Sequence, residues 1–339
     1  MTKSSVKDRI IMLLNENKEG IPQSLIHKIL NVSKSWVSEI LRDLELSGVI
    51  ERISVGHQYI VRIRKTPVKE VKSSINSLKI GIVWSSEYPF LTPFAKKLRR
   101  DLDIDLDVVV YPNALRATWA LVNGEVDLAL SPLITQIYAY SLTKALRIIG
   151  GGAYGGAAII ENENAHSDII TSSELSTMDL FRAIAINSKL VHPSKTIYLS
   201  KPEDIFRLIN KLGVRYFVIW HPILEKLVSR GFKIIARWDD FDLGYCCTLA
   251  ASIRIHSRLR RRIAIQYHEA IEYFIKSPEK WIDWYAAKVG ISSGIIRRGL
   301  KYYGFRPYLD IKLIYNALKN ANIMVPDPST IKKAIEYNS

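Results

Sequence analysis

The sequence predicts an α/β protein in which a small N-terminal domain precedes a larger domain built from two α/β blocks. Residues 1–65 have the order of three helices followed by a β-hairpin. From residue 78 onward, short apolar strands alternate with amphipathic helices, and this alternation occurs twice. The length of 339 residues suits two or three domains, and the apolar fraction of 48% is enough to fill their cores.

The composition limits which classes of partner and cofactor are compatible with the chain. The formal net charge of +15 indicates nucleic acid, an acidic membrane or an anionic ligand, although a solvated lysine-rich surface also explains it. The two cysteines, Cys246 and Cys247, are adjacent, which provides neither a disulfide framework nor metal-ligand spacing. We therefore expect no metal and no cofactor. The first residues lack the features of a signal peptide, and no stretch approaches about eighteen continuous apolar residues. These features predict a cytoplasmic protein without a membrane partner.

Local patterns predict the elements of residues 1–65. Apolar residues repeat at helical spacing before "EGIP", and Pro22 suits the first turn of a second helix. Ser33 is an N-cap for a third helix, which Gly48 ends. Two short alternating runs, "VIERIS" and "YIVRIR", then predict the hairpin.

The string "VSKSWVSEILRDLELSGVIER" resembles the helix-turn-helix of MarR-type regulators, and residues 5–64 together have the winged helix-turn-helix order. This resemblance implies that the third helix enters the major groove of DNA and that the wing lies near phosphates. Trp36 either packs against bases or sugar, or covers the junction with the first helix. A winged helix used for protein contacts is the alternative. The DNA-binding residues that we predict are Lys34, Ser35, Trp36, Ser38, Glu39, Arg42, Arg52, His57 and Arg62.

The remainder of the chain reads as a linker and a larger α/β part. Residues 66–77 are polar and lack apolar periodicity, so we predict a linker there. The alternation that follows predicts mostly parallel sheets with helices on both faces. In the second block, "FRAIAIN" is predicted as a strand. Two extended apolar runs, "GGAAIIEN" and "LGYCCTLAASI", join the blocks, and the chain becomes helical near Ser257.

Three strings of the larger part are similar to those of type II periplasmic binding proteins from the nitrate, sulfonate and thiamine-precursor branch. They are "ALVNGEVDLALSPL", "VIWHPILEKLVSRGF" and "SPEKWIDWYAAKVGIS", and the resemblance covers residues 78–325. It implies a two-lobed ligand-sensing domain over 78–339, with the first lobe from 78–157 and 246–339 and the second from 158–245. The layout of the whole chain is similar to that of LysR-type regulators, although no long linker helix follows the wing.

In open α/β sheets, ligands lie at the carboxyl ends of strands and at helix N-termini, where free N–H groups favour anions. Trp84 and Trp220 are equally well explained as core residues, and Ser85 and Ser131 as N-caps. The ligand-binding residues that we predict are Trp84, Ser85, Ser86, Glu87, Tyr88, Asn113, Ser131, Gly152, Tyr154, Asn187, Ser188, Trp220 and His221.

Residues 150–155, "GGGAYG", match the G-x-G-x-x-G fingerprint of dinucleotide sites. That fingerprint requires a helix after the glycines, whereas an extended apolar run follows them here, so we expect no dinucleotide. We predict instead a turn that enters the first crossing between the lobes and flexes there.

These features favour a ligand-responsive transcription regulator. Its partners would be double-stranded operator DNA, a small-molecule effector with anions among the candidates, and further copies of the chain in a homodimer or higher oligomer. The alternative is an enzyme on the same fold, such as a transferase, a dehydratase or a thiamine-pyrimidine-synthase-like protein. Because no catalytic constellation is present, we predict no catalytic residues and no enzyme activity. A DNA-binding architectural protein whose second domain has lost its ligand is a third class.

Overall fold

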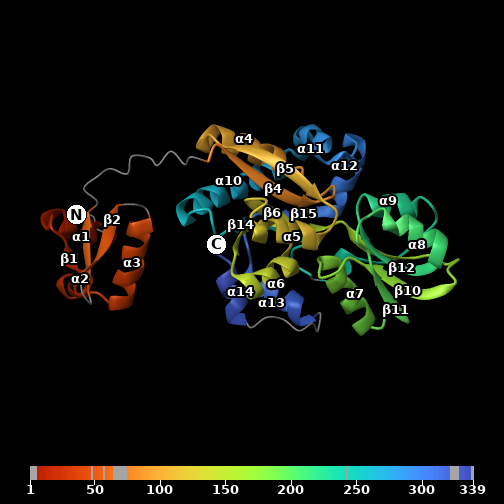
Figure 1. The fold of residues 1–339 in the computed structure, drawn as a ribbon, viewed down its shortest axis with the longest axis horizontal. Helices are drawn as coiled ribbons and strands as arrows, with labels where there is room; N and C mark the ends of the chain where they lie inside the picture. The colour runs from red at the N-terminus through yellow and green to blue at the C-terminus, as the bar shows by residue number, and fades with distance from the viewer. Residues whose placement is uncertain are drawn as a thin grey trace. The chain divides into compact units, whose positions relative to one another are not determined.

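The computed structural model describes residues 6–46, 49–55, 58–63, 75–241, 243–320 and 328–336. The chain divides into two compact units, residues 1–75 and 76–339 (Figure 1). The predicted linker lies mostly outside the described residues, and so does His57.

The N-terminal unit contains helices and a small antiparallel sheet in the order β1-β3-β2. Its core forms because Val37, Leu41 and Leu44 recur at helical spacing and meet the apolar faces of the first two helices. Its elements are α1 (Val6–Glu16), β1 (Ile21–Pro22), α2 (Gln23–Leu30), α3 (Lys34–Leu46), β2 (Ile50–Val55) and β3 (Gln58–Ile63).

The larger unit has two lobes, each built on a five-stranded sheet. The first sheet has the order β5-β4-β6-β14-β7, and its strands carry apolar residues on both faces because helices cover both. The elements of this lobe before the crossing are β4 (Ser77–Val83), α4 (Leu91–Leu102), β5 (Asp105–Tyr111), α5 (Ala114–Asn123), β6 (Leu128–Pro132), α6 (Leu133–Thr143) and β7 (Leu146–Gly150).

The second lobe has the sheet order β11-β10-β12-β9-β13. Figure 1 shows it in green beside the first lobe. Its elements are β9 (Ala157–Glu161), β10 (Ser167–Ser172), α7 (Thr177–Asn187), β11 (Lys195–Tyr198), α8 (Asp204–Leu212), β12 (Val214–Trp220), α9 (Ile223–Val228), β13 (Lys233–Arg237) and a short 3-10 helix (Trp238–Asp240).

The chain then returns to the first lobe through β14 (Cys247–Ser252), and the C-terminal helices pack there: α10 lies against α4, and α14 against α6. None of the described helices is long and apolar enough to span a membrane. The C-terminal elements are α10 (Ser257–Lys276), a 3-10 helix (Pro278–Trp281), α11 (Ile282–Val289), α12 (Ser293–Gly299), a 3-10 helix (Leu300–Tyr302), β15 (Tyr303–Arg306), α13 (Ile311–Asn320) and α14 (Pro328–Ala334).

The prediction of mostly parallel sheets is confirmed, because four of the five strands in each sheet run in one direction. The exceptions are β14 and β9, which each run antiparallel to both of their neighbours. One prediction about the elements is wrong. The segment "FRAIAIN" is not a strand but the C-terminal part of α7. Ser176 caps this helix by accepting a hydrogen bond from the Met178 amide, and Phe181, Ile184 and Ala185 form its buried face. β10 and β11 were missing from the sequence prediction.

The glycine-rich stretch forms a short strand, β8 (Gly152–Gly155), paired with β15. The predicted turn is confined to Gly155 and Gly156, whose φ angles are +88° and +70°. Close packing explains the glycines: a Cβ at Gly152 would lie 2.2 Å from the Cys247 carbonyl oxygen. A Cβ at Gly156 would lie 2.0 Å from the ring of Tyr303. The segment therefore fits tightly against the C-terminal part of the chain.

Substituting Gly156 tests this packing, with Gly231 as a matched control. Both glycines have positive φ, but a Cβ at Gly231 meets nothing within 4 Å. We expect Gly231→Ala to lower the free energy of unfolding by about 1–2 kcal/mol through backbone strain alone. Gly156→Ala adds a clash with the buried Tyr303 ring and should cost a further ~1–3 kcal/mol in urea unfolding. Equal losses in the two variants would contradict the packing argument.

Candidate functional site

A cavity lies between the two lobes of the larger unit. It is bounded by the ends of strands β4, β6 and β12, the beginnings of three helices, and the second crossing between the lobes. Most atoms that face it are apolar, and all of its lining residues except the half-buried Val83 are buried. The residues that line it are Val83, Ser85, Glu87, Tyr88, Ala114, Pro132, Ser173, Ser176, Thr177, Met178, Trp220, Cys246 and Cys247.

Three helices begin at the wall of this cavity. Ala114 is the first residue of α5, Pro132 directly precedes α6, and Ser176 and Thr177 begin α7. The N-terminus of a helix carries a partial positive charge and unsatisfied backbone N–H groups, which favour negative charge. Among the described residues that line the cavity there is no lysine, arginine or histidine. Basic side chains therefore contribute no positive charge to the lining, and the helix N-termini are the groups there that favour an anion.

One wall holds a compact group of ionisable side chains, which we call the Glu–thiol cluster: Glu87, Cys246 and Cys247. Their carboxylate and sulfur atoms all lie within 4.8 Å of one another, and the two Sγ atoms are 3.9 Å apart. The Tyr88 hydroxyl donates to Cys247 Sγ at 3.0 Å, and Ser85 Oγ donates to Glu87 Oε2 at 3.4 Å. Glu87 Oε1 is buried and has no hydrogen-bond partner among the described residues.

Burial sets the protonation of this cluster. Glu87 is only 2% exposed, and desolvation raises the pKa of its carboxyl above the ordinary 4.5 despite hydrogen bonds that oppose the shift. Desolvation likewise raises the pKa of the Cys247 thiol well above its ordinary value, and the neighbouring Cys246 and Glu87 act in the same direction. The cluster is therefore held in a low-dielectric environment that disfavours negative charge.

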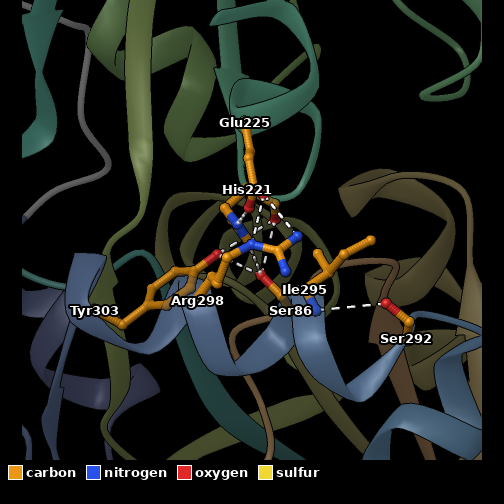
Figure 2. Close-up of polar contacts among 7 residues, drawn as sticks. All are labelled: Ser86, His221, Glu225, Ser292, Ile295, Arg298 and Tyr303. Carbon is orange, nitrogen blue, oxygen red and sulfur yellow. Dashed lines mark hydrogen bonds and ion pairs between the residues drawn. The ribbon is translucent and has the colours of Figure 1, made fainter. Parts of the chain in front are cut away.

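A second group, the inter-lobe network, joins the lobes next to the cavity (Figure 2). Ser86, in the loop after β4, lies with its Oγ 2.6 Å from His221 Nδ1, and His221 follows β12 of the other lobe. His221 Nε2 is 2.9 Å from Glu225, which accepts a hydrogen bond from Arg298 on α12 at 2.8 Å. The Tyr303 hydroxyl is 3.1 Å from Ser86 Oγ. These contacts connect side chains from both lobes in one chain of hydrogen bonds.

Ser86, His221 and Glu225 have the order of a nucleophile, a base and a carboxylate, which raises the question of catalysis. Ser86 is 1% exposed and His221 is fully buried. Neither residue is among those that line the cavity. Because Ser86 Oγ is enclosed by His221 and Tyr303, a substrate in the cavity has no access to it. The hydrogen bonds of this network hold the two lobes together rather than perform catalysis.

The structure places some predicted ligand-binding residues at the cavity and others beside it. Ser85, Glu87, Tyr88 and Trp220 line it. Trp84, Ser86, Asn113 and His221 make contacts between elements around it: the Trp220 indole donates to the Trp84 carbonyl at 3.0 Å, the Trp84 indole donates to Val289, and Asn113 Nδ2 donates to the Ser200 carbonyl at 2.8 Å.

The other predicted residues do not reach the cavity. Ser131 is buried against Thr118 and Gln136, to which its hydroxyl is hydrogen-bonded. Gly152 and Tyr154 belong to β8. Asn187 and Ser188 are exposed at the end of α7 opposite to the cavity, because the segment before them is a helix rather than a strand.

Sequence reasoning missed much of the lining. The missed residues are Val83, Ala114, Pro132, Ser173, Ser176, Thr177, Met178, Cys246 and Cys247. The run "SSELSTMDL" contained a signal, because Ser176 precedes a helix with an acidic residue in its first turn. For the cysteines the sequence offered none, since Glu87 is distant from them along the chain.

In the N-terminal unit, the predicted DNA-binding residues lie on α3 and the hairpin. Lys34, Ser35, Ser38, Glu39 and Arg42 are on α3 with Trp36, whose side chain is 49% exposed. The two hairpin arginines are occupied by acidic partners: Arg52 pairs with Glu45, and Arg62 pairs with Glu51 at 2.6 Å.

Solved structures similar to this chain share the architecture of the larger unit. The alkanesulfonate-binding protein SsuA from Xanthomonas axonopodis pv. citri, bound to MOPS, has a TM-score of 0.61 at 17% identity over 78% of this chain and 99% of its own. The periplasmic aliphatic sulphonate-binding protein SsuA from Escherichia coli has a TM-score of 0.61 at 18% identity over 78% and 94%. The larger unit has a periplasmic-binding-protein-like fold. The two-lobed fold that the sequence predicts is thereby confirmed.

The periplasmic nitrate-binding protein NrtA from Synechocystis PCC 6803 shares this periplasmic-binding-protein-like fold, with a TM-score of 0.60 at 11% identity over 77% of this chain and 85% of its own. Residues 4–64 match the model of a domain of unknown function, DUF7343. No curated protein sequence matches the chain.

These comparisons contradict the prediction of a cytoplasmic, DNA-binding transcription regulator. The similar proteins bind solutes, two of them are described as periplasmic, and none of the three is described as a regulator. Double-stranded DNA as the partner, the homodimer on an operator and the cytoplasmic location are therefore wrong. The prediction gave the resemblance of about sixty N-terminal residues more weight than the periplasmic-binding-protein-like fold, which accounts for most of the chain.

From the inter-lobe network we predict that the free energy of unfolding falls in acid. Burial lowers the pKa of His221 below its ordinary 6.5, with Arg298 acting in the same direction and Glu225 against it. A lowered pKa contributes stability that is present above pH 6.5 and is lost as the pH falls towards the folded-state pKa. The free energy of unfolding of the wild type should therefore fall below this pH, whereas His221→Gln should lack this component.

At neutral pH the same variant should be less stable by about 1–3 kcal/mol, because its buried partners lose a hydrogen bond. His192→Gln, at an exposed position, is the control and should leave both quantities unchanged. Urea unfolding at several pH values measures them, and parallel pH profiles for wild type and His221→Gln would contradict this role.

From the burial of Glu87 we predict that the free energy of unfolding falls at alkaline pH. Because its folded-state pKa is raised, it contributes stability that is present below pH 4.5 and is lost as the pH rises through the folded-state pKa. The loss is about 1.4 kcal/mol for each unit between the two pKa values. In buffer with a chelator, Glu87→Gln should be more stable than wild type at alkaline pH, while exposed Glu163→Gln should not. Thermal unfolding across pH tests this, and a destabilised Glu87→Gln at alkaline pH would refute it.

Proposed function

We propose that the larger unit binds a small organic molecule with an anionic head group in the cavity between its lobes. The observation that carries the proposal is the convergence of the N-termini of α5, α6 and α7 on one buried cavity. Helix N-termini bind anions without a charged side chain, and this cavity has no basic residue among those that line it.

The walls indicate an organic ligand rather than a bare inorganic anion. Val83, Met178 and Trp220 present apolar surface to the cavity, and burying an apolar group there is favourable. A mostly apolar lining with a few polar groups is typical of sites for small organic molecules. The similar sulfonate-binding proteins are named for ligands of this type, which combine an alkyl chain with an acidic head.

Binding is better supported than catalysis. The nucleophile, base and carboxylate of the inter-lobe network are sealed from the cavity. The two lobes are also joined by hydrogen bonds outside the inter-lobe network, including Asn113 to Ser200 and Thr135 Oγ1 to the Leu175 carbonyl at 2.6 Å. Such an arrangement suits capture of a ligand by closure of two lobes.

For the N-terminal unit, we propose the winged-helix arrangement. The order of a helix, a short strand, two helices and a hairpin supports it, as does the pairing of β1 with β3 at the edge of the hairpin.

The ligand proposal is tested by isothermal titration with a series that varies the head group on one alkyl chain: butanesulfonate, butanoate, butanol and butylamine, with nitrate as the bare anion. We expect the sulfonate or the carboxylate to bind at least about tenfold more tightly than the alcohol, a difference of about 1.4 kcal/mol. The amine and nitrate should bind more weakly than the best anion.

A variant pair locates the head group. Ser176→Asp keeps a good N-cap but places a negative charge at the beginning of α7, so it should weaken anion binding about tenfold or more. Ser188→Asp puts the same charge at the exposed opposite end of the same helix and should bind like wild type. Anion binding that survives Ser176→Asp, or a series in which only the amine binds, would overturn the proposal.

A further inference from the structure

We propose that the Glu–thiol cluster, Glu87, Cys246 and Cys247, is a binding site for a thiophilic metal cation, with Zn²⁺ as the biological representative. The inference goes beyond the proposed function, because the cation needs no organic ligand in order to bind.

The distances within the cluster fit one ion. In a tetrahedral zinc site with Zn–S bonds of about 2.3 Å, two sulfur ligands lie about 3.8 Å apart. The Cys246 and Cys247 Sγ atoms are 3.9 Å apart, and the Glu87 carboxylate lies within 4.8 Å of both. Three donors are therefore already close to the separations that a single tetrahedral ion requires.

The backbone explains why adjacent cysteines can act together. Neighbouring residues of a regular strand point to opposite faces of the sheet. Cys246 lies just outside β14, which begins at Cys247, so this alternation does not hold between them. As a result both thiols reach the same cavity and lie against the same carboxyl group.

A buried donor without a partner is the second observation that points to a ligand. Glu87 is 2% exposed, and its Oε1 atom has no hydrogen-bond partner among the described residues. Leaving such an oxygen unsatisfied in a buried site costs roughly 1–3 kcal/mol. A bound cation would satisfy it and would compensate the negative charge that the buried cluster otherwise disfavours.

The donor set selects the class of metal. Two sulfur donors and one carboxylate suit zinc and other soft or borderline cations, whereas Mg²⁺ and Ca²⁺ prefer shells of oxygen. The surrounding hydrogen bonds would hold the donors in place: Tyr88 donates to Cys247 Sγ, and Thr177 Oγ1 donates to the Cys246 carbonyl at 2.8 Å. Because all three donors line the cavity, the fourth coordination position is available to water or to a bound ligand.

The test is a titration of the reduced, metal-free full-length protein with Co²⁺, which reports thiolate ligation by its charge-transfer absorption. We expect one equivalent to bind and Zn²⁺ to displace it, while Mg²⁺ does not. Cys246→Ser, Cys247→Ser and Glu87→Gln should each weaken binding at least about tenfold, the loss that even an outer-shell change can cause. Ser173→Ala, in the same cavity wall but outside the cluster, should bind like wild type.

Thermal unfolding of each variant shows that it is folded, and Glu87→Gln is the most informative because it removes the carboxylate charge while keeping the shape of the side chain. The absence of thiolate-to-cobalt absorption in wild type would overturn the proposal, as would undiminished binding by the double variant Cys246→Ser, Cys247→Ser. The titration contains no organic ligand, so its outcome is independent of the anion titrations above. Cobalt binding together with failed anion binding would remove only the proposed function.

Discussion

The arrangement of the cavity depends on one constraint, which is the antiparallel insertion of β14 between β6 and the edge strand β7 of the first sheet. This strand arrives only after the second lobe has been completed, and it pairs with β6 on one side and β7 on the other. β9 occupies the equivalent place in the second sheet, between β12 and β13. In each lobe, therefore, the antiparallel strand directly follows a segment in which the chain crosses from one lobe to the other. The segment before β14 carries both cysteines, and for this reason they lie at the cavity wall.

The charge of the protein and the charge of its cavity are different. The chain has a formal net charge of +15, yet the described residues that line the cavity include no basic side chain. The one carboxyl group at the wall is buried and resists ionisation. Helix N-termini are then the groups at the wall that favour negative charge. A ligand of this site would be recognised by backbone geometry and shape more than by formal charges.

The sequence predicts the two-lobed fold well, because it depends on alternation of apolar strands and amphipathic helices over long stretches. It fails where periodicity is ambiguous: the apolar run before Asn187 suits a strand or a helix equally, and only the Ser176 cap and the packing of Phe181 decide for the helix. Because of this error, Asn187 and Ser188 were predicted at the site, and Ser176 and Thr177 were not. Residues directly after β4 and β12 were found, since strand ends could be located from sequence. The pairing of Glu87 with the cysteines could not be predicted, because it arises from tertiary contacts between distant segments.

The burial of the cavity has a kinetic consequence. Side chains on both walls, such as Tyr88 and Thr177, are almost fully buried, so a ligand must wait for the lobes to separate before it can enter or leave. Separation requires the Ser86–His221 and Trp220–Trp84 hydrogen bonds to break together. Motions of whole lobes typically take microseconds to milliseconds. At high ligand concentration the observed association rate should reach a plateau set by opening, and residence times should depend on residues that never touch the ligand.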